Sequence, residues 1–140
     1  RQAVLHQALQ GITARDIVTK ECSLITQQLS VGQLVRDYIL VKGHRYFVVV
    51  DGVKLQGVVT MRNIRRTPKG HWDSTPVGEI MTPAGEVKTA HPEQAAVSLL
   101  EQMNELRVNQ MPVLEEDEVI GVVTWDSLIR LVNTRAELRV

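Results

Sequence analysis

The sequence predicts an α/β (α+β) protein built from two copies of one small unit, each with the order strand, helix, strand, strand, helix, packed face to face about an approximate twofold axis. Three observations predict this fold: a Gly-Val-Val-Thr motif occurs twice, at 57–60 and 121–124; an apolar strand precedes each copy; and a helical pattern precedes each of those strands. A recurring motif indicates a repeated supersecondary unit. One such unit buries only part of its apolar surface, so two units are expected to share a core.

The two halves match with almost constant spacing. Two pairs of similar segments lie 64 and 63 residues apart, respectively: 48–51 with 112–115, and 16–19 with 79–82. The halves therefore differ by one residue. The alignment places it between Thr26 and Leu34, opposite 89–98, where a turn can absorb it.

Each half opens with a short strand candidate, at 24–26 and at 87–89. In the first half Ser30 is the expected N-cap and Gln33 completes a capping box, which predicts a helix to about Val41. In the second half, apolar side chains recur at helical spacing and predict a core-facing helix over about 93–106. These side chains are Ala96, Leu99, Leu100, Met103 and Leu106.

A β-hairpin follows each helix. Residues 46–50 are rich in β-branched and aromatic side chains, and the turn formers Asp51 and Gly52 join them to a second strand at about 55–60. The second hairpin has strands at 110–114 and 119–124 around the acidic segment 115–118. A helix closes each half, and the second of these, from about Trp125 to Val132, is the longer.

The linker between the halves is marked by its composition. The stretch 65–76 contains two prolines, Gly70 and several charges, which is typical of a connecting segment. The expected organisation is a helical lead-in at 1–12, a first repeat at 13–67, a linker at 68–76, a second repeat at 77–134 and a tail at 135–140.

These motifs, in this order and twice, resemble the CBS domain, and the pair resembles the Bateman module formed by two such repeats. The most diagnostic segments are Ile-Met-Thr-Pro at 80–83, Asn-Gln-Met-Pro-Val at 109–113 and the two Gly-Val-Val-Thr strands that lead into helices. A finer resemblance is to the CBS region of site-2-protease-like zinc metallopeptidases. It depends on segment 11–17, on Pro68 with Trp72, and on segment 126–138.

The resemblance implies a cleft between the repeats that holds an adenosine-type ligand such as AMP, ATP or S-adenosylmethionine. The family pattern has Thr or Ser followed three residues later by an Asp that accepts hydrogen bonds from the ribose hydroxyls. This sequence departs from the pattern, because Asn63 follows Thr60 and Ser127 follows Thr124. Asp126 stands one residue early, about 100° away around the helix. The alternative is that these residues only cap helices and nothing binds.

Three basic residues complete the candidate nucleotide contacts. His44 and Arg45 precede the first hairpin and Arg107 precedes the second, at positions that lie at the cleft mouth in this fold. They could meet phosphate, and the simpler alternative is that they are solvated turn residues. No metal site is expected within the chain, since its four histidines lack metal-ligand spacing and its one cysteine, Cys22, has no partner. Zinc would belong only to an absent part of a parent metallopeptidase.

The balance of charges argues against a nucleic-acid-binding protein. Sixteen acidic and sixteen basic side chains give no excess for nucleic-acid binding, so no nucleic-acid partner is expected. The basic run Arg62, Arg65, Arg66 and Lys69 is by default a solvated linker face, and an anionic lipid head group or an acidic partner surface is the alternative.

The sequence leaves two hypotheses for the function. The first is a regulatory module that senses an adenosine nucleotide or mediates association and is attached to an effector. The finer resemblance implies that this effector is a membrane-embedded zinc metalloprotease. The module would form a homodimer and face the cytoplasm. The second is a constitutive structural dimerisation domain with no ligand. An enzyme in its own right is disfavoured, because no nucleophile, base and orienting group assemble by any recognised pattern.

Overall fold

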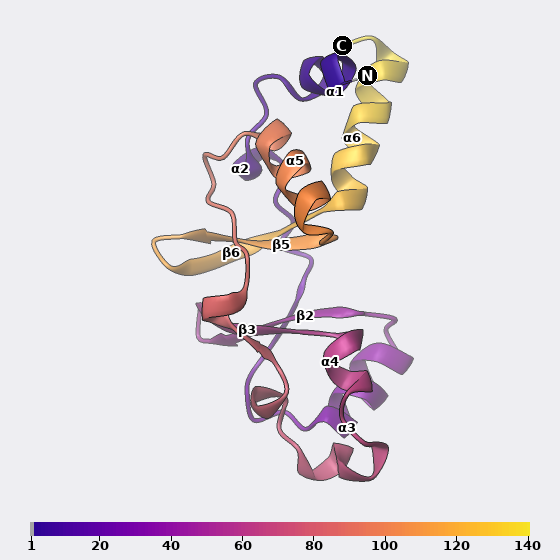
Figure 1. Ribbon diagram of the computed structural model, residues 1–140, viewed down its shortest axis with the longest axis vertical. Helices are drawn as coiled ribbons and strands as arrows, with labels where there is room; N and C mark the ends of the chain where they lie inside the picture. The colour runs from indigo at the N-terminus through magenta and orange to yellow at the C-terminus, as the bar shows by residue number, and fades with distance from the viewer. Residues whose placement is uncertain (1) are drawn as a thin grey trace. The chain divides into compact units, whose positions relative to one another are not determined.

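The computed structural model describes residues 2–140, with side chains described from Leu5 onward (Figure 1). The chain forms two compact units, each with its own core. Unit 1 contains the residues up to Glu21 together with Lys88–Val140, and unit 2 contains Cys22–Val87. The expected lead-in at 1–12 includes Arg1, which lies outside the described residues.

Unit 2 contains a small sheet with helices packed on it. Strands β1 (Ser23–Ile25) and β2 (Tyr46–Asp51) pair in parallel, β2 and β3 (Lys54–Thr60) form an antiparallel hairpin, and β4 (Thr82–Pro83) pairs antiparallel with β3. The helical segments are α3 (Val31–Leu34), the π-helix η1 (Val35–Leu40), α4 (Met61–Arg65), and the 3-10 turns η2 (Lys69–Ser74), η3 (Val77–Glu79) and η4 (Ala84–Glu86). Strand, helix, strand, strand and helix follow one another from β1 to α4, as predicted.

The core of unit 2 gathers around Phe47, which has no exposed surface and meets the Tyr38 ring edge-on at a centroid distance of 6.2 Å. Branched side chains from the strands and helices surround it: Ile25, Val31, Leu34, Val35, Val49, Val59, Ile64 and Val77. Trp72 of the linker packs against the same cluster, and its indole Nε1 donates a hydrogen bond to the Thr67 carbonyl at 2.9 Å. The aromatic side chain that the sequence placed in a polar linker therefore docks on its own unit.

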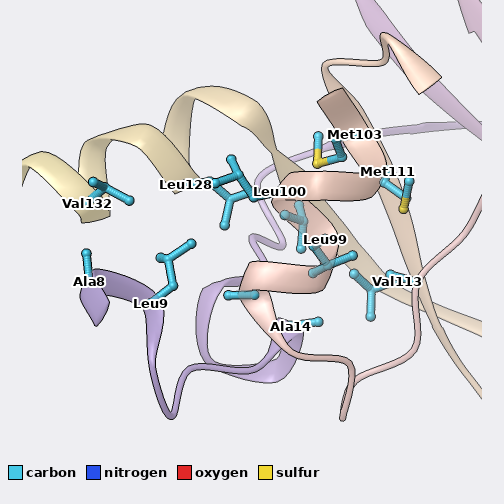
Figure 2. Close-up of a cluster of buried hydrophobic side chains, with 13 residues drawn as sticks. Ala8, Leu9, Ala14, Leu99, Leu100, Met103, Met111, Val113, Leu128 and Val132 are labelled. Atoms are coloured by element: carbon cyan, nitrogen blue, oxygen red, sulfur yellow. The ribbon is translucent and has the colours of Figure 1, made fainter. Parts of the chain in front are cut away.

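Unit 1 is built from the second hairpin and longer helices. Strands β5 (Gln110–Glu115) and β6 (Glu118–Thr124) are antiparallel, and the helices are α1 (Gln2–Leu9), α2 (Ala14–Ile17), α5 (Ala96–Leu106) and α6 (Trp125–Leu138). Figure 2 shows side chains of α1, α5 and α6 meeting in one core, with Leu9, Leu99 and Leu128 almost fully buried. The α/β class and the repeated hairpin-and-helix architecture predicted from the sequence are confirmed.

The opening stretch of each repeat, called here its lead segment (13–19 in the first repeat and 76–83 in the second), pairs with the body of the other repeat. In unit 1, Thr13 pairs antiparallel with Ala95, and Thr19 pairs with Val122. In unit 2, the corresponding lead segment of the second repeat pairs in the same way, Pro76 with Ser30 and β4 with Gly57 and Val58 of β3. Because the repeats exchange their lead segments, unit 1 is built from two separate stretches of the chain, whereas unit 2 is one continuous stretch that ends inside the second repeat.

The place predicted for the length difference between the halves is wrong. Ile25 pairs in parallel with Val49, and Ala90 pairs in parallel with Val113, so Ile25 and Ala90 are equivalent with an offset of 65 residues. Compared with the first repeat, the second repeat therefore has two additional residues before Ala90, around the turn η4. It has one residue fewer between its first helix, α5, and its hairpin. The first repeat accommodates that extra residue in the π-helix η1, the usual result of inserting one residue into an α-helix.

Two element boundaries also differ from the prediction. Residues 87–89 form no strand, and the pairing that β1 makes in unit 2 is reduced in unit 1 to the single bridge at Ala90. Helix α5 begins at Ala96 instead of about Glu93, because Ala95 is extended (φ −65°, ψ 138°) and is engaged in the bridge to Thr13. In both cases a long-range backbone pairing sets the boundary.

Candidate functional site

The hairpin of unit 2 brings its predicted site residues to one end. Tyr46 and Thr60 are cross-strand partners, so His44 and Arg45, which enter β2, lie at the end of the hairpin where Thr60 leaves β3. Both basic side chains are exposed, and His44 Nδ1 is hydrogen-bonded to Ser23 Oγ. The strand register therefore brings the segments that carry Thr60, His44 and Arg45 to one end of the hairpin.

The hairpin of unit 1 has the same geometry. Gln110 pairs with Thr124, and the Trp125 amide donates to the Asn109 carbonyl at 2.8 Å. Arg107, which ends α5 in the left-handed conformation (φ 57°), therefore approaches the turn from β6 into α6 and is exposed. Thr124 and Arg107 come from segments 17 residues apart in the chain, and the strand register brings them to the same hairpin end.

The first turn of α6 uses some of its polar groups internally. Thr124 Oγ1 accepts from the Ser127 amide at 3.1 Å, and Ser127 Oγ donates back to the Thr124 carbonyl at 2.9 Å. Asp126 is exposed, and among the described residues its carboxylate has no hydrogen bond or ion pair. At this hairpin end, Asp126 and Arg107 are the charged groups that remain available to a ligand.

The corresponding turn in unit 2 is saturated by Asn63. Its Oδ1 accepts from the Thr60 amide at 2.8 Å and from Thr60 Oγ1 at 2.9 Å. Its Nδ2 donates to the Ile80 carbonyl at 2.9 Å and to Thr82 Oγ1 at 3.3 Å. One amide therefore caps α4 and holds the exchanged lead segment 80–82. The sequence singled out Asn63 as a weakened ribose contact and gave no signal of its bonds to residues 17 and 19 positions away.

We expect Asn63→Asp to lower the free energy of unfolding by about 2 kcal/mol, since a carboxylate keeps the bonds from Thr60 but loses both donors and faces the Ile80 carbonyl. Urea unfolding measures the change. Asn133→Asp, at an exposed position of α6, is the control for the amide-to-carboxylate change itself. Equal effects of the two substitutions would show that the bonds of Asn63 to the lead segment contribute no stability.

The titratable groups near these ends do not indicate an activated nucleophile. Burial raises the pKa of the Cys22 thiol, which disfavours the reactive thiolate. Burial also raises the pKa of Tyr46, and Cys22 adds to that shift. In unit 1 the hydrogen bond from Arg15 holds the pKa of Glu115 below its usual value of 4.5, at an exposed site where solvent weakens the pair. This pair, with the bond from Arg15 to Glu93, joins α2 to the second repeat.

One depression lies away from the predicted residues. It has a volume of about 360 Å³, belongs to unit 1 and is bounded by α1 and α6 near the two ends of the chain. Its lining is Gln7, Ala8, Arg135, Ala136, Arg139 and Val140. Arg135 is already used there, because its Nη1 donates to the Ala8 carbonyl at 2.9 Å. No sequence pattern indicates this depression, since it forms only where α1 and α6, from opposite ends of the chain, meet.

Residues 2–140 contain neither a metal-ligand cluster nor a helix that could span a membrane. No three His, Cys, Asp or Glu side chains in this range gather closely enough to hold a metal ion. No helix in the same range has the length and apolar composition needed to cross a bilayer.

The exchanged lead segments, the repeated hairpins and the polar strand-to-helix turns define a module of two repeated α/β units. The profile of the CBS domain matches this chain twice, at residues 14–70 and 77–134. The chain therefore belongs to the CBS domain family as a tandem pair, and CBS domains are non-catalytic modules.

Relatives of known sequence include Rip3 of Mycobacterium tuberculosis, a protein provisionally named as a zinc metalloprotease. It is 27% identical over 130 residues, which cover 91% of this chain and 33% of the relative. The chain thus spans about a third of the length of this curated relative. This sequence similarity confirms the resemblance to the CBS region of such metallopeptidases.

Solved structures show the same fold at lower identity. The CBS domain of a bacterial CNNM/CorC-family Mg²⁺ transporter, in complex with ATP, superposes with a TM-score of 0.79 at 18% identity, covering 94% of each chain. The CBS pair of protein MJ0100, in complex with 5′-methylthioadenosine and S-adenosyl-L-methionine, has a TM-score of 0.72 at 22% identity, covering 88% of this chain and 97% of that one.

Proposed function

We propose that this CBS pair is a regulatory module that binds one adenosine-type ligand at the hairpin end of unit 1. The observation that carries the proposal is the difference between the two hairpin ends. At the unit 2 end the amide of Asn63 is fully hydrogen-bonded and the exposed charged side chains are cationic, Arg45 and Arg62. The unit 1 end instead offers both an exposed carboxylate, Asp126, and an exposed guanidinium, Arg107, neither of them paired among the described residues.

The chemistry at unit 1 suits a nucleotide. The Asp126 carboxylate can accept hydrogen bonds from ribose hydroxyls, the Arg107 guanidinium can pair with phosphate, and the N-terminus of α6 adds a favourable field for an anion. The structures of related fold hold ATP or S-adenosylmethionine, which supports this ligand class. In this proposal Thr124 and Ser127 shape the turn and offer their backbone groups to the ligand. The unit 2 hairpin end, which carries Thr60, Asn63, His44 and Arg45, binds no ligand.

Isothermal titration with ATP, AMP and S-adenosylmethionine tests the proposal. We expect one ligand per chain, and a loss of affinity of about tenfold in Arg107→Gln and in Asp126→Asn, the magnitude of one charged hydrogen bond. Arg45→Gln, the matched change at the unit 2 hairpin, should leave the affinity unchanged. No binding at millimolar ligand, or a loss in Arg45→Gln equal to that in Arg107→Gln, would contradict the proposal.

The module is further proposed to control a zinc metalloprotease to which it is attached, with the module facing the cytoplasm. The support is the similarity to Rip3, which is about three times longer than the matched region. A ligand regulates such an effector only if it binds one conformational state more tightly than another. The sequence of the complete gene tests the attachment: a His-Glu-x-x-His motif within apolar segments is expected, and a different enzyme or a transporter there would overturn it.

A constitutive homodimerisation domain without a ligand is the second candidate. The observation that favours a module without a ligand is the internal saturation of Asn63 in unit 2, which is what a purely structural turn requires. Sedimentation velocity at several concentrations separates the two candidates. A dimer whose dissociation constant is unchanged by millimolar ATP, AMP or S-adenosylmethionine supports the structural role.

A further inference from the structure

We propose that the outward surface of the η1 and α4 helices in unit 2 docks onto an anionic phospholipid bilayer. The docking surface consists of two exposed apolar side chains, Leu40 and Val41, and a set of unpaired cations. These are Arg45, Arg62, Arg65, Arg66 and Lys69, with Lys42 beside them. The inference is independent of ligand binding in unit 1.

The apolar part comes from the end of η1. Val35, Tyr38 and Ile39 pack against the core of unit 2, which turns the opposite side of the helix to solvent. Leu40 is 74% exposed and Val41 is 77% exposed, in a chain whose core holds most large aliphatic side chains. Gly43 (φ 75°) then ends the segment, and its amide donates to the Ile39 carbonyl at 2.9 Å. Two neighbouring apolar side chains therefore project into water from an ordered turn.

The cationic part lies on the loop that enters β2 and on the segment that follows β3. Because Tyr46 pairs with Thr60, the loop that enters β2 and the helix that leaves β3 emerge from one end of the sheet. In α4, Ile64 is buried and Met61 packs on the core, so Arg62 and Arg65 point outward. None of the five cations of the docking surface forms an ion pair with another described residue. The ammonium of the neighbouring Lys42 lies 5.2 Å from the centroid of the Tyr38 ring.

The charge of the two units is strongly unequal. Unit 2 carries eight Lys and Arg against five Asp and Glu, a net charge of +3, whereas unit 1 carries eight against eleven, a net charge of −3. On the helical side of unit 2, Asp73 is already paired with Arg36, which leaves Asp37 as the exposed acid of η1. A symmetric contact between two copies of this surface would bring like charges together, so an anionic partner fits it better.

A bilayer fits better than a protein because the apolar side chains project from a turn instead of lining a groove. Specific protein interfaces bury on the order of 800 Å² on each partner with close shape complementarity. A lipid surface needs only apolar side chains that reach the acyl boundary and cations that meet phosphate, and each Lys or Arg contributes about fivefold to partitioning. Leu40, Val41 and the cations of the docking surface supply both.

Vesicle co-sedimentation of the 140-residue chain tests the proposal. We expect binding to vesicles of phosphatidylcholine with about 30% phosphatidylglycerol, at least tenfold weaker binding to pure phosphatidylcholine, and weakening as NaCl rises from about 0.05 to about 0.5 M. Leu40→Ser with Val41→Ser should weaken binding about tenfold or more. Arg65→Gln with Arg66→Gln should weaken it about 25-fold. All four positions are exposed, and circular dichroism checks that the variants fold.

The opposite end of the same hairpin provides matched controls. Val53 is 50% exposed and Lys54 is exposed, so Val53→Ser and Lys54→Gln make equivalent changes outside the docking surface and should leave vesicle binding unchanged. Four outcomes would overturn the proposal. The first two are no preference for anionic vesicles and equal losses in the controls. The third is binding to poly-glutamate without binding to vesicles, which would assign the surface to an acidic protein. The fourth is self-association abolished by the Leu40 and Val41 substitutions with no vesicle binding, which would assign it to a second copy.

Discussion

Phe47→Ala is expected to lower the free energy of unfolding by about 3–5 kcal/mol. Phe47 has no exposed surface, lies at the centre of the unit 2 core and packs edge-on with Tyr38, whose ring centroid is 6.2 Å away. Truncation removes this burial and leaves a cavity that the paired strands on either side cannot collapse to fill. Urea unfolding followed by circular dichroism measures the loss.

Val53→Ala is the control for Phe47→Ala, since it truncates a half-exposed side chain at the turn of the same hairpin. A change within about 0.5 kcal/mol is expected there. Phe47→Leu should fall between the two, because it keeps most of the apolar volume. If Phe47→Ala cost less than about 1 kcal/mol, the core assigned to unit 2 would be wrong.

Gly121→Ala is expected to cost about 3 kcal/mol, a large effect for one added methyl group. A Cβ at this position would lie 2.4 Å from the Thr19 carbonyl oxygen and 2.6 Å from a Val18 methyl, and the backbone φ of 155° adds strain. The obstacle is the backbone of the exchanged lead segment, which is held to β6 by hydrogen bonds between Thr19 and Val122. Relief of the clash requires that segment to move away.

Two measurements distinguish this clash from a general loss of stability. In Gly121→Ala, hydrogen exchange of the Thr19 and Val122 amides should accelerate more than exchange elsewhere in β6, because the bridge between them opens first. Gly85→Ala is the matched control, with open space around its Cβ and no positive φ, and should be nearly neutral or slightly stabilising. Similar unfolding energies for the two variants would contradict the close approach of the lead segment.

Local patterns were enough to predict the hairpins and most helix starts. The Ser30 cap was read from Ser and Gln three residues apart, and Ser30 Oγ indeed accepts from the Gln33 amide at 3.1 Å. Asp51 and Gly52 lie at the hairpin turn, where Gly52 has a φ of 65°. Thr60 and Thr124, at the two hairpin ends, were located from the repeated Gly-Val-Val-Thr motif.

The candidate site was predictable only in part. The sequence placed Arg107 and Asp126 near the end of the second hairpin, and the register of β5 and β6 brings their segments together. It did not predict that Asn63 donates to the lead segment, nor that Trp72 docks on the core of its own unit. These contacts join segments without any periodic relation between them, so no pattern within a short window encodes them.

By itself the sequence determined the repeat, the class of fold and the order of strands and helices, because those follow from hydrophobic periodicity and turn-forming residues close together in the chain. Only the tertiary structure decided which segments pair across the repeats, where the extra residue enters as the π-helix η1, and which polar side chains remain free for a ligand. The physical reason is that a backbone or side-chain hydrogen bond between distant residues depends on their meeting in space, and single-sequence patterns carry no record of that meeting.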